Sequence, residues 1–181
     1  MRLQISDIVR KADRIVEICG TRDPYRIARD TGVEIVPCGF RSQRGAYKVI
    51  NRNRFIFVGE DQDPRMKRTV ILHELGHDVL HRAEATKTGG FREFDIFGAA
   101  EDRMEYEANV FAAQVGIGDG EFLRMCREGY DMRQIACASD SDVNLVALKA
   151  DIMISRGYAL VRQDRENGFL SYRNADGAVP V

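Results

Sequence analysis

All three histidines of the 181-residue chain fall within one short segment, Ile71 to His81. His73 and His77 stand four residues apart, so on a helix their rings lie on one face, a turn apart, and can bind one metal ion. Glu74 falls in the same sector of that helix, whereas the opposite sector is apolar. This H-E-x-x-H pattern predicts a zinc site in which Glu74 is the catalytic acid–base residue.

A structural alternative is a buried helix whose histidines are satisfied by hydrogen bonds alone. It leaves Glu74, on the same face, unexplained, so we favour metal binding. His81 lies about 12 Å beyond His73 along a helix axis, too far to share the metal, and we expect it to be a hydrogen-bonded helix end.

A third ligand must come from elsewhere, because a catalytic zinc typically takes three protein ligands and one water. The next predicted helix, residues 101–115, offers Glu101, Glu105 and Glu107. The helical wheel leaves Glu105 and Glu107 open, since they flank the apolar stripe at similar angles on opposite sides. Asn109 stands one turn beyond Glu105 on the same side and can support a histidine ligand by a hydrogen bond, which favours Glu105. We expect Glu107 to lie on a solvated face.

The histidine helix is expected to start at Asp63, an N-cap residue followed by proline, and to run into the low eighties. Gly76 in its middle costs about 1 kcal/mol relative to alanine, which predicts that another element packs closely there. The small Ala108 and Ala112 would let the next helix approach.

The elements before this helix read as two helices and a small sheet. An amphipathic helix is predicted at 5–18, and Asp23, Pro24 and Gly32 mark a shorter one. Alternating segments at 33–37, 46–50 and 54–58 predict a small antiparallel sheet, with a turn at 51–53. An exposed sheet edge beside the metal could bind an extended substrate, although an ordinary edge without a guest fits the sequence equally well.

The remaining third of the chain has no chemical motif of comparable strength. Residues 84–99 hold an aromatic cluster, Phe91, Phe94 and Phe97, that suits either a loop over the site or a plain connection. Three helical patterns within 121–157 resemble a helix-turn-helix, but few basic side chains accompany the third, which favours packing or partner docking over DNA binding. A hairpin is predicted around Asn167-Gly168, followed by eight loose residues. We therefore divide the chain into a zincin-like domain, 1–117, and a helical and hairpin extension, 118–181, packed on it.

Composition indicates the compartment of the protein and the partners it is expected to lack. There are 27 basic and 28 acidic residues, a net charge of −1, so no overall field draws the chain to nucleic acid or anionic lipid. Charged residues interrupt the first 20 positions, and no apolar run is long enough to span a bilayer. The four cysteines show no C-x-x-C spacing, so neither a disulfide framework nor a thiolate cluster is indicated. We expect a cytoplasmic protein without a membrane partner.

The segments His73–His77 and Glu105–Ala113 resemble the ImmA/IrrE family of metallopeptidases. The resemblance covers roughly residues 20–115 and implies an α+β, zincin-like fold with Glu105 rather than Glu107 as the third ligand. The chain departs from the family pattern after Ala113. Several family members cleave a helix-turn-helix repressor encoded nearby and so release transcription. The resemblance therefore implies a bacterial or mobile-element protein whose substrate is a transcriptional regulator.

The sequence thus predicts a zinc endopeptidase. A zinc ion would activate water and polarise the scissile carbonyl, while Glu74 would move the proton from water to the leaving amine. Candidates for the oxyanion donor are Tyr47, Tyr106 and Arg103, each of which has an ordinary structural role as its alternative. The rival functions are a non-catalytic zinc module that sequesters a repressor and a DNA-binding regulator acting through residues 121–157.

Overall fold

The computed structural model describes residues 3–41, 43–88, 103–163 and 169–172. The chain forms two compact units, Met1–Gly116 and Ile117–Val181, and the predicted domain boundary falls beside this division. The packing of the second unit on the first stays a prediction. Within the described residues, no helix combines the length and apolarity needed to cross a membrane.

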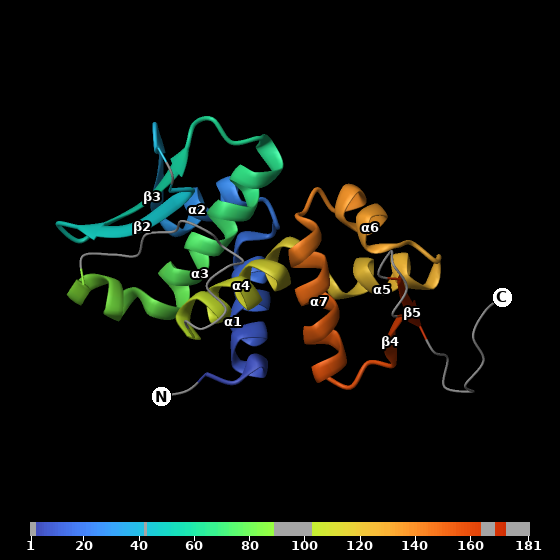
Figure 1. Cartoon of the computed structure of the whole chain (residues 1–181). Helices are drawn as coiled ribbons and strands as arrows, with labels where there is room; N and C mark the ends of the chain where they lie inside the picture. Colours follow the sequence, from blue (N-terminus) through green and yellow to red (C-terminus); the bar gives the residue numbers. More distant parts are fainter. Residues whose placement is uncertain (1–2, 42, 89–102, 164–168, 173–181) are drawn as a thin grey trace. The chain divides into compact units, whose positions relative to one another are not determined.

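Helix α3 is the centre of the first unit. In chain order the unit contains α1 (Ile5–Cys19), α2 (Pro24–Thr31), β1 (Val33–Cys38), β2 (Gly45–Ile50), β3 (Asn53–Gly59), α3 (Pro64–Thr88) and α4 (Arg103–Gly116). The sheet packs against α3 through β2 and β3, and α4 packs between α3 and α1 (Figure 1). This α+β arrangement confirms the predicted fold class.

Local signals set both ends of α2 and the start of α3 where the sequence predicts them. The Asp23 carboxylate accepts a hydrogen bond from the backbone N–H of Tyr25 at 3.0 Å, and α2 ends at Gly32, whose φ of 74° suits glycine. Asp63 caps α3 in the same way, accepting from the backbone N–H of Met66 at 3.0 Å. The predicted starts of both helices are therefore confirmed.

The sheet has the order β1-β3-β2 and is mixed. Strands β2 and β3 form an antiparallel hairpin whose turn residues, Asn51 and Arg52, have φ values of 50° and 65°. Strand β1 runs parallel to β3, so the prediction of a purely antiparallel sheet is wrong for β1. The chain reverses after β1 and again after β2, and β1 pairs with the third strand instead of its neighbour in sequence. β2 is thereby left at one edge.

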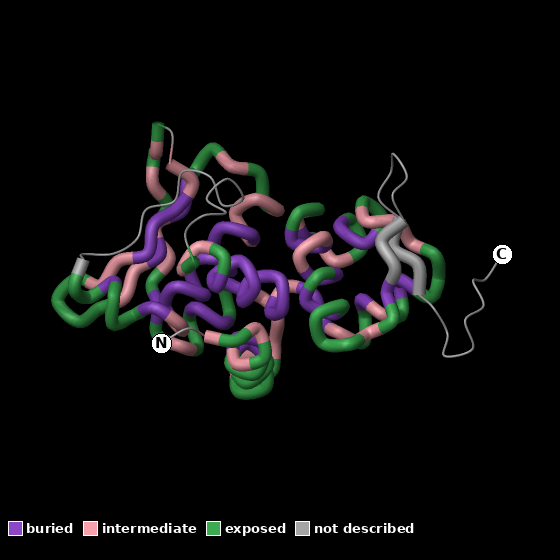
Figure 2. Tube along the Cα trace, turned by 60° about the horizontal axis from the view of Figure 1, so that its bottom comes forward, coloured by how far each residue is buried: buried purple, intermediate pink, exposed green. Residues whose placement is uncertain are grey.

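Helices α3 and α4 cross at Gly76, as its position in the helix predicts. A Cβ atom at Gly76 would lie 2.9 Å from the Cα and 3.0 Å from the carbonyl oxygen of Ala108. The middle of α3, residues 69–78, is buried throughout, as is α4 from residue 107 to 115 (Figure 2). Helix α3 runs on to Thr88, beyond its predicted end, with non-helical backbone angles at His81 (φ −126°, ψ 17°).

The second unit contains α5 (Asp119–Arg127), α6 (Met132–Ala138), α7 (Val143–Ser155), β4 (Leu160–Gln163) and β5 (Phe169–Tyr172). β4 and β5 pair antiparallel, which confirms the predicted hairpin strands. The amine of Lys149 is buried and donates to the Asp119 carboxylate, which also accepts from Arg156 at 2.7 Å. These two cations of the α7 region thus form ion pairs within the unit. That this unit docks on a protein and does not bind DNA stays a prediction.

Several predicted features lie outside the described residues. They are the aromatic cluster Phe91, Phe94 and Phe97, the candidate Glu101, the turn at Asn167-Gly168 and the eight C-terminal residues.

We predict that Gly76→Ala destabilises the protein by about 1–3 kcal/mol, because the added methyl group meets the backbone of α4. Urea unfolding measures the change. The matched control is Gly120→Ala in α5, where an added Cβ meets nothing within 4 Å. That control should be neutral or stabilise by a few tenths of a kcal/mol. Equal effects of the two substitutions would contradict a close helix crossing.

Candidate metal centre

Three potential ligand atoms from two helices converge beside the middle of α3. The Nε2 atoms of His73 and His77 lie 3.1 Å apart. Glu105 on α4 places its Oε2 atom 3.0 Å from Nε2 of His73 and 3.3 Å from Nε2 of His77. Both rings are buried, and the Glu105 side chain is 12% exposed. The structure therefore brings together the three residues predicted as ligands.

The donor set and its spacing fit a zinc ion. A tetrahedral zinc with bonds of about 2.0–2.1 Å holds its ligand atoms about 3.3 Å apart, and the three observed separations are 3.0, 3.1 and 3.3 Å. Two imidazoles and one carboxylate form a typical catalytic set, which reserves a fourth position for water. Among the described residues, His73, His77 and Glu105 are the cluster of possible ligand side chains close enough together to hold a metal ion.

Asn109 supports His73, as its spacing from Glu105 predicts. Its Oδ1 atom lies 2.9 Å from Nδ1 of His73. An amide oxygen only accepts hydrogen bonds, so Nδ1 of His73 carries the proton and the neutral ring presents a lone pair at Nε2. That lone pair points toward Glu105 and His77, where a metal would bind.

Glu107 differs from its predicted surroundings, whereas His81 is hydrogen-bonded, as predicted. We expected Glu107 on a solvated face, but it is only 4% exposed. Its Oε2 atom accepts from Nε2–H of His81 at 3.0 Å, and its Oε1 atom accepts from Nε–H of Arg103 at 2.6 Å. Nδ1 of His81 in turn lies 3.1 Å from Nδ1 of His77. The prediction for Glu107 is wrong because His81, itself buried, draws this carboxylate inward.

Burial and hydrogen bonding act in opposite directions on Glu107. Burial raises the pKa of its carboxyl group, but hydrogen bonds from His81 and Arg103 outweigh that effect, and the pKa is lowered overall. Glu107 is therefore a carboxylate at neutral pH, able to accept two hydrogen bonds.

Burial also determines the protonation of His77. Desolvation lowers the pKa of its ring from 6.5 to about 4, against the opposing effect of the nearby Glu105 carboxylate. His77 is consequently neutral at physiological pH, the state in which an imidazole can bind a metal.

Glu74 is fully buried on α3, and its carboxylate lies against the start of the edge strand β2. A Cβ atom at Gly45 would stand 2.8 Å from Oε1 of Glu74 and 2.4 Å from Cγ1 of Val70. Only glycine fits at this point, because any side chain would collide with the acid or the helix beneath it. The backbone of β2 can thus approach the predicted catalytic acid closely.

The candidates for an oxyanion donor have other contacts. The Tyr47 hydroxyl is buried and donates to Oδ1 of Asp78 at 2.6 Å, and both burial and this hydrogen bond raise its pKa. Arg54 and Arg82 donate to the same carboxylate. Asp78 therefore ties α3 to β2 and β3. Arg103 binds Glu107, and Tyr106 is 42% exposed.

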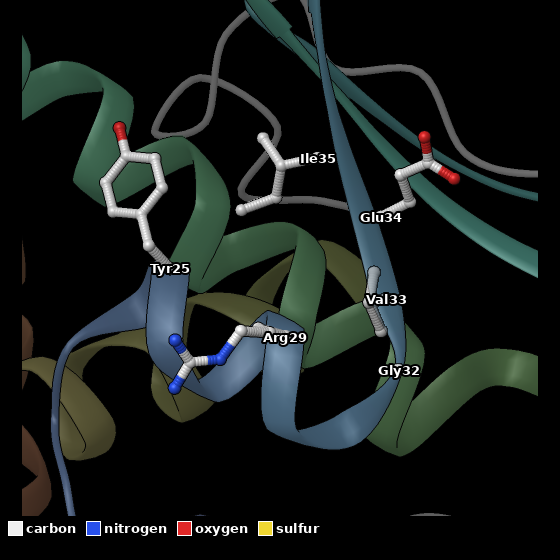
Figure 3. Close-up of a pocket in the computed structure, with 6 residues that line it drawn as sticks. All are labelled: Tyr25, Arg29, Gly32, Val33, Glu34 and Ile35. Atoms are coloured by element: carbon white, nitrogen blue, oxygen red, sulfur yellow. The ribbon is translucent and has the colours of Figure 1, made fainter.

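The described residues also line a cavity of about 430 Å³ at the other edge of the sheet (Figure 3). Its walls come from α2 and β1 and consist of Tyr25, Arg29, Gly32, Val33, Glu34 and Ile35. None of these residues belongs to the histidine cluster, so we do not assign this cavity to the predicted chemistry.

Sequence reasoning did not predict the contacts that three residues make: Gly45, His81 and Glu107. For His81 the sequence did hold a signal, because His77 and His81 are four residues apart and so share one helix face. No pattern in the sequence identifies Gly45 or Glu107, because their partners come from other elements of the fold.

Comparison with known proteins identifies the family of this chain. A family model described as the IrrE N-terminal-like domain, peptidase M78, matches residues 28–153. The chain is also 26% identical over 137 residues to "Uncharacterized immunity region protein 2" of Bacillus phage phi105, an alignment that covers 75% of this chain and 84% of the relative. The family match continues through α5 and α6 and into α7, beyond the residues that carry the sequence resemblance. Since it takes in well over half of the chain, this protein belongs to the peptidase M78 family of IrrE N-terminal-like domains.

Proposed function

We propose that this protein is a zinc-dependent endopeptidase that cleaves a helix-turn-helix transcriptional repressor and so relieves repression. The observation that carries the proposal is the convergence of His73, His77 and Glu105. Glu74, which follows His73 in the sequence, is a buried acid on the same helix. The role in regulation is drawn from the ImmA/IrrE resemblance and from the phage relative, whose name places it in an immunity region.

In the proposed mechanism, His73, His77 and Glu105 would hold the zinc. When bound, the ion would supply a water of lowered pKa and polarise the scissile carbonyl. Glu74 accepts the proton of the attacking water and returns it to the leaving amine. Asn109 holds the ring of His73 in the tautomer that leaves Nε2 for the metal.

The edge strand β2 is the proposed site for the extended substrate. In the part of the chain that the structure describes, β2 pairs only with β3, and its first residue, Gly45, adjoins Glu74. A peptide that added to this edge would run past the catalytic acid. Backbone hydrogen bonds would then hold the peptide, and side-chain pockets would select it.

Incubation with a natural candidate substrate tests the proposal. The zinc-loaded protein is mixed with the helix-turn-helix regulator encoded beside its gene, and new termini are identified by mass spectrometry. The proposal requires defined fragments that depend on zinc. An intact regulator that instead forms a stable complex with the protein would favour the sequestering module over the peptidase.

We predict that Glu74→Gln lowers kcat by about 10²- to 10⁴-fold, because the amide cannot accept a proton from water. Zinc binding should persist, since Glu74 is not among the three converging groups. The matched control is Glu84→Gln, the same change at an exposed position of the same helix, and it should cleave normally. Regulatory activity that survives in Glu74→Gln would contradict a hydrolytic function.

The pKa of His77 predicts how acid affects the metal-free protein. The folded state has a pKa of about 4 at this ring, against an ordinary value of 6.5, so only the unfolded state binds the proton between these values. The contribution of a neutral His77 to the free energy of unfolding is therefore fully present above about pH 6.5. It falls as the pH drops toward 4, by up to about 1.4 kcal/mol per pH unit. Urea unfolding across this range measures the slope. The slope should be shallower in His77→Asn. An equal slope in the variant would show that His77 does not cause the loss of stability in acid.

A further inference from the structure

We infer that His81 and Glu107 are positioning residues that fix the tautomer of His77 and thereby present its Nε2 lone pair to the metal. The inference deepens the proposed function and rests on it. It assigns a purpose to a buried polar chain that the zinc-binding residues alone do not require.

The chain of contacts is continuous from the surface to the ligand atom. The Arg103 side chain, 48% exposed, donates through Nε–H to Oε1 of Glu107 at 2.6 Å. Oε2 of Glu107 lies 3.0 Å from Nε2 of His81, and Nδ1 of His81 lies 3.1 Å from Nδ1 of His77. Nε2 of His77 then faces Glu105 at 3.3 Å.

The Glu107 carboxylate sets the direction of the hydrogen bonds when the His81 ring is neutral. This carboxylate only accepts, so Nε2 of His81 carries the one ring proton and Nδ1 carries none. Nδ1 of His81 therefore accepts from Nδ1–H of His77. A neutral His77 protonated at Nδ1 has its lone pair at Nε2, beside Nε2 of His73 at 3.1 Å.

The opposite tautomer would disable the site. With a proton on Nε2, the His77 ring would point N–H at the position a metal must occupy. The relay through His81 and Glu107 excludes this arrangement on the His77 side, as Asn109 does for His73. The two ligand histidines thus receive separate supports, both ending on α4.

The cost of burying these groups supports a specific role. His81 and Glu107 are each only 4% exposed, and they lie in a unit whose core is otherwise largely apolar. Buried polar pairs contribute little to stability compared with apolar side chains of similar size. Their placement beside His77 is explained if they orient that ring.

Two substitutions at His81 separate orientation from packing. His81→Phe keeps a ring of similar size but removes the acceptor for Nδ1–H of His77, whereas His81→Asn places an amide oxygen near the original Nδ1 position. We expect zinc affinity, measured by competition with a chromophoric chelator, to fall about 10- to 100-fold in His81→Phe. In His81→Asn most of that affinity should return.

A second readout does not depend on zinc. Long-range 15N–1H correlation spectra of the metal-free protein at about pH 8, where imidazoles are neutral, report which nitrogen carries the proton. His77 should be protonated at Nδ1 in the wild type and should populate the Nε2–H tautomer in His81→Phe. Glu107→Gln should shift the population in the same direction, because an amide can donate to His81 as well as accept.

The control is Gln114→Leu, which changes another buried polar residue of α4 and removes its hydrogen bond to Asp13 at 2.8 Å. It should leave both the zinc affinity and the His77 tautomer unchanged. The inference is overturned if His81→Phe binds zinc as the wild type does, or if the tautomer of His77 is the same in both proteins. A wild type that fails to bind zinc would refute the proposed function instead.

Discussion

Helices α3 and α4 cross where Gly76 faces Ala108, and the candidate site depends on that contact. The two backbones come so close that a single methyl group at Gly76 would lie 2.9 Å from the Cα atom of Ala108. At this distance a side chain as short as glutamate reaches from α4 to the histidines of α3, as Glu105 does. The glycine weakens the helix locally, and the close crossing that it permits assembles the three converging groups.

Helix α4 supplies more than one acid to α3. Glu105 faces the Nε2 atoms of both metal-site histidines, Asn109 accepts from Nδ1 of His73, and Glu107 accepts from His81. These three polar side chains follow one another at every second residue, so they span a broad face of the helix. On α3, the rings of His73, His77 and His81 each lie within hydrogen-bond distance of a side chain of α4 or of the neighbouring histidine.

The sheet is fixed to α3 close to the proposed catalytic acid, Glu74. The edge strand β2 is fixed to α3 by the hydroxyl of Tyr47, which donates to Asp78, and by the close approach of Gly45 to Glu74. Asp78 follows His77 directly in the sequence but binds Tyr47, Arg54 and Arg82, groups from the sheet and from its own helix. One turn of α3 thus carries part of the candidate metal site and holds the strand proposed to bind the substrate.

The sequence by itself determined what depends on local spacing. The helix bearing His73, Glu74 and His77, its cap at Asp63 and the need for a close neighbour at Gly76 all follow from periodicity and residue type within one segment. The α+β class and the family were also accessible, because the motif and the glutamate segment are short and continuous. Glu105 was favoured over Glu107 through its spacing from Asn109.

Only the tertiary structure decided what depends on distant partners. The parallel pairing of β1 with β3, the burial of Glu107 beside His81 and the fit of Gly45 over Glu74 join residues that are far apart in the sequence. A helical wheel measures angles within one helix, and it left Glu105 and Glu107 equivalent because it contains no information about what covers each side of the helix. Packing against α3 supplied the missing partner and turned an apparently exposed acid into a buried one.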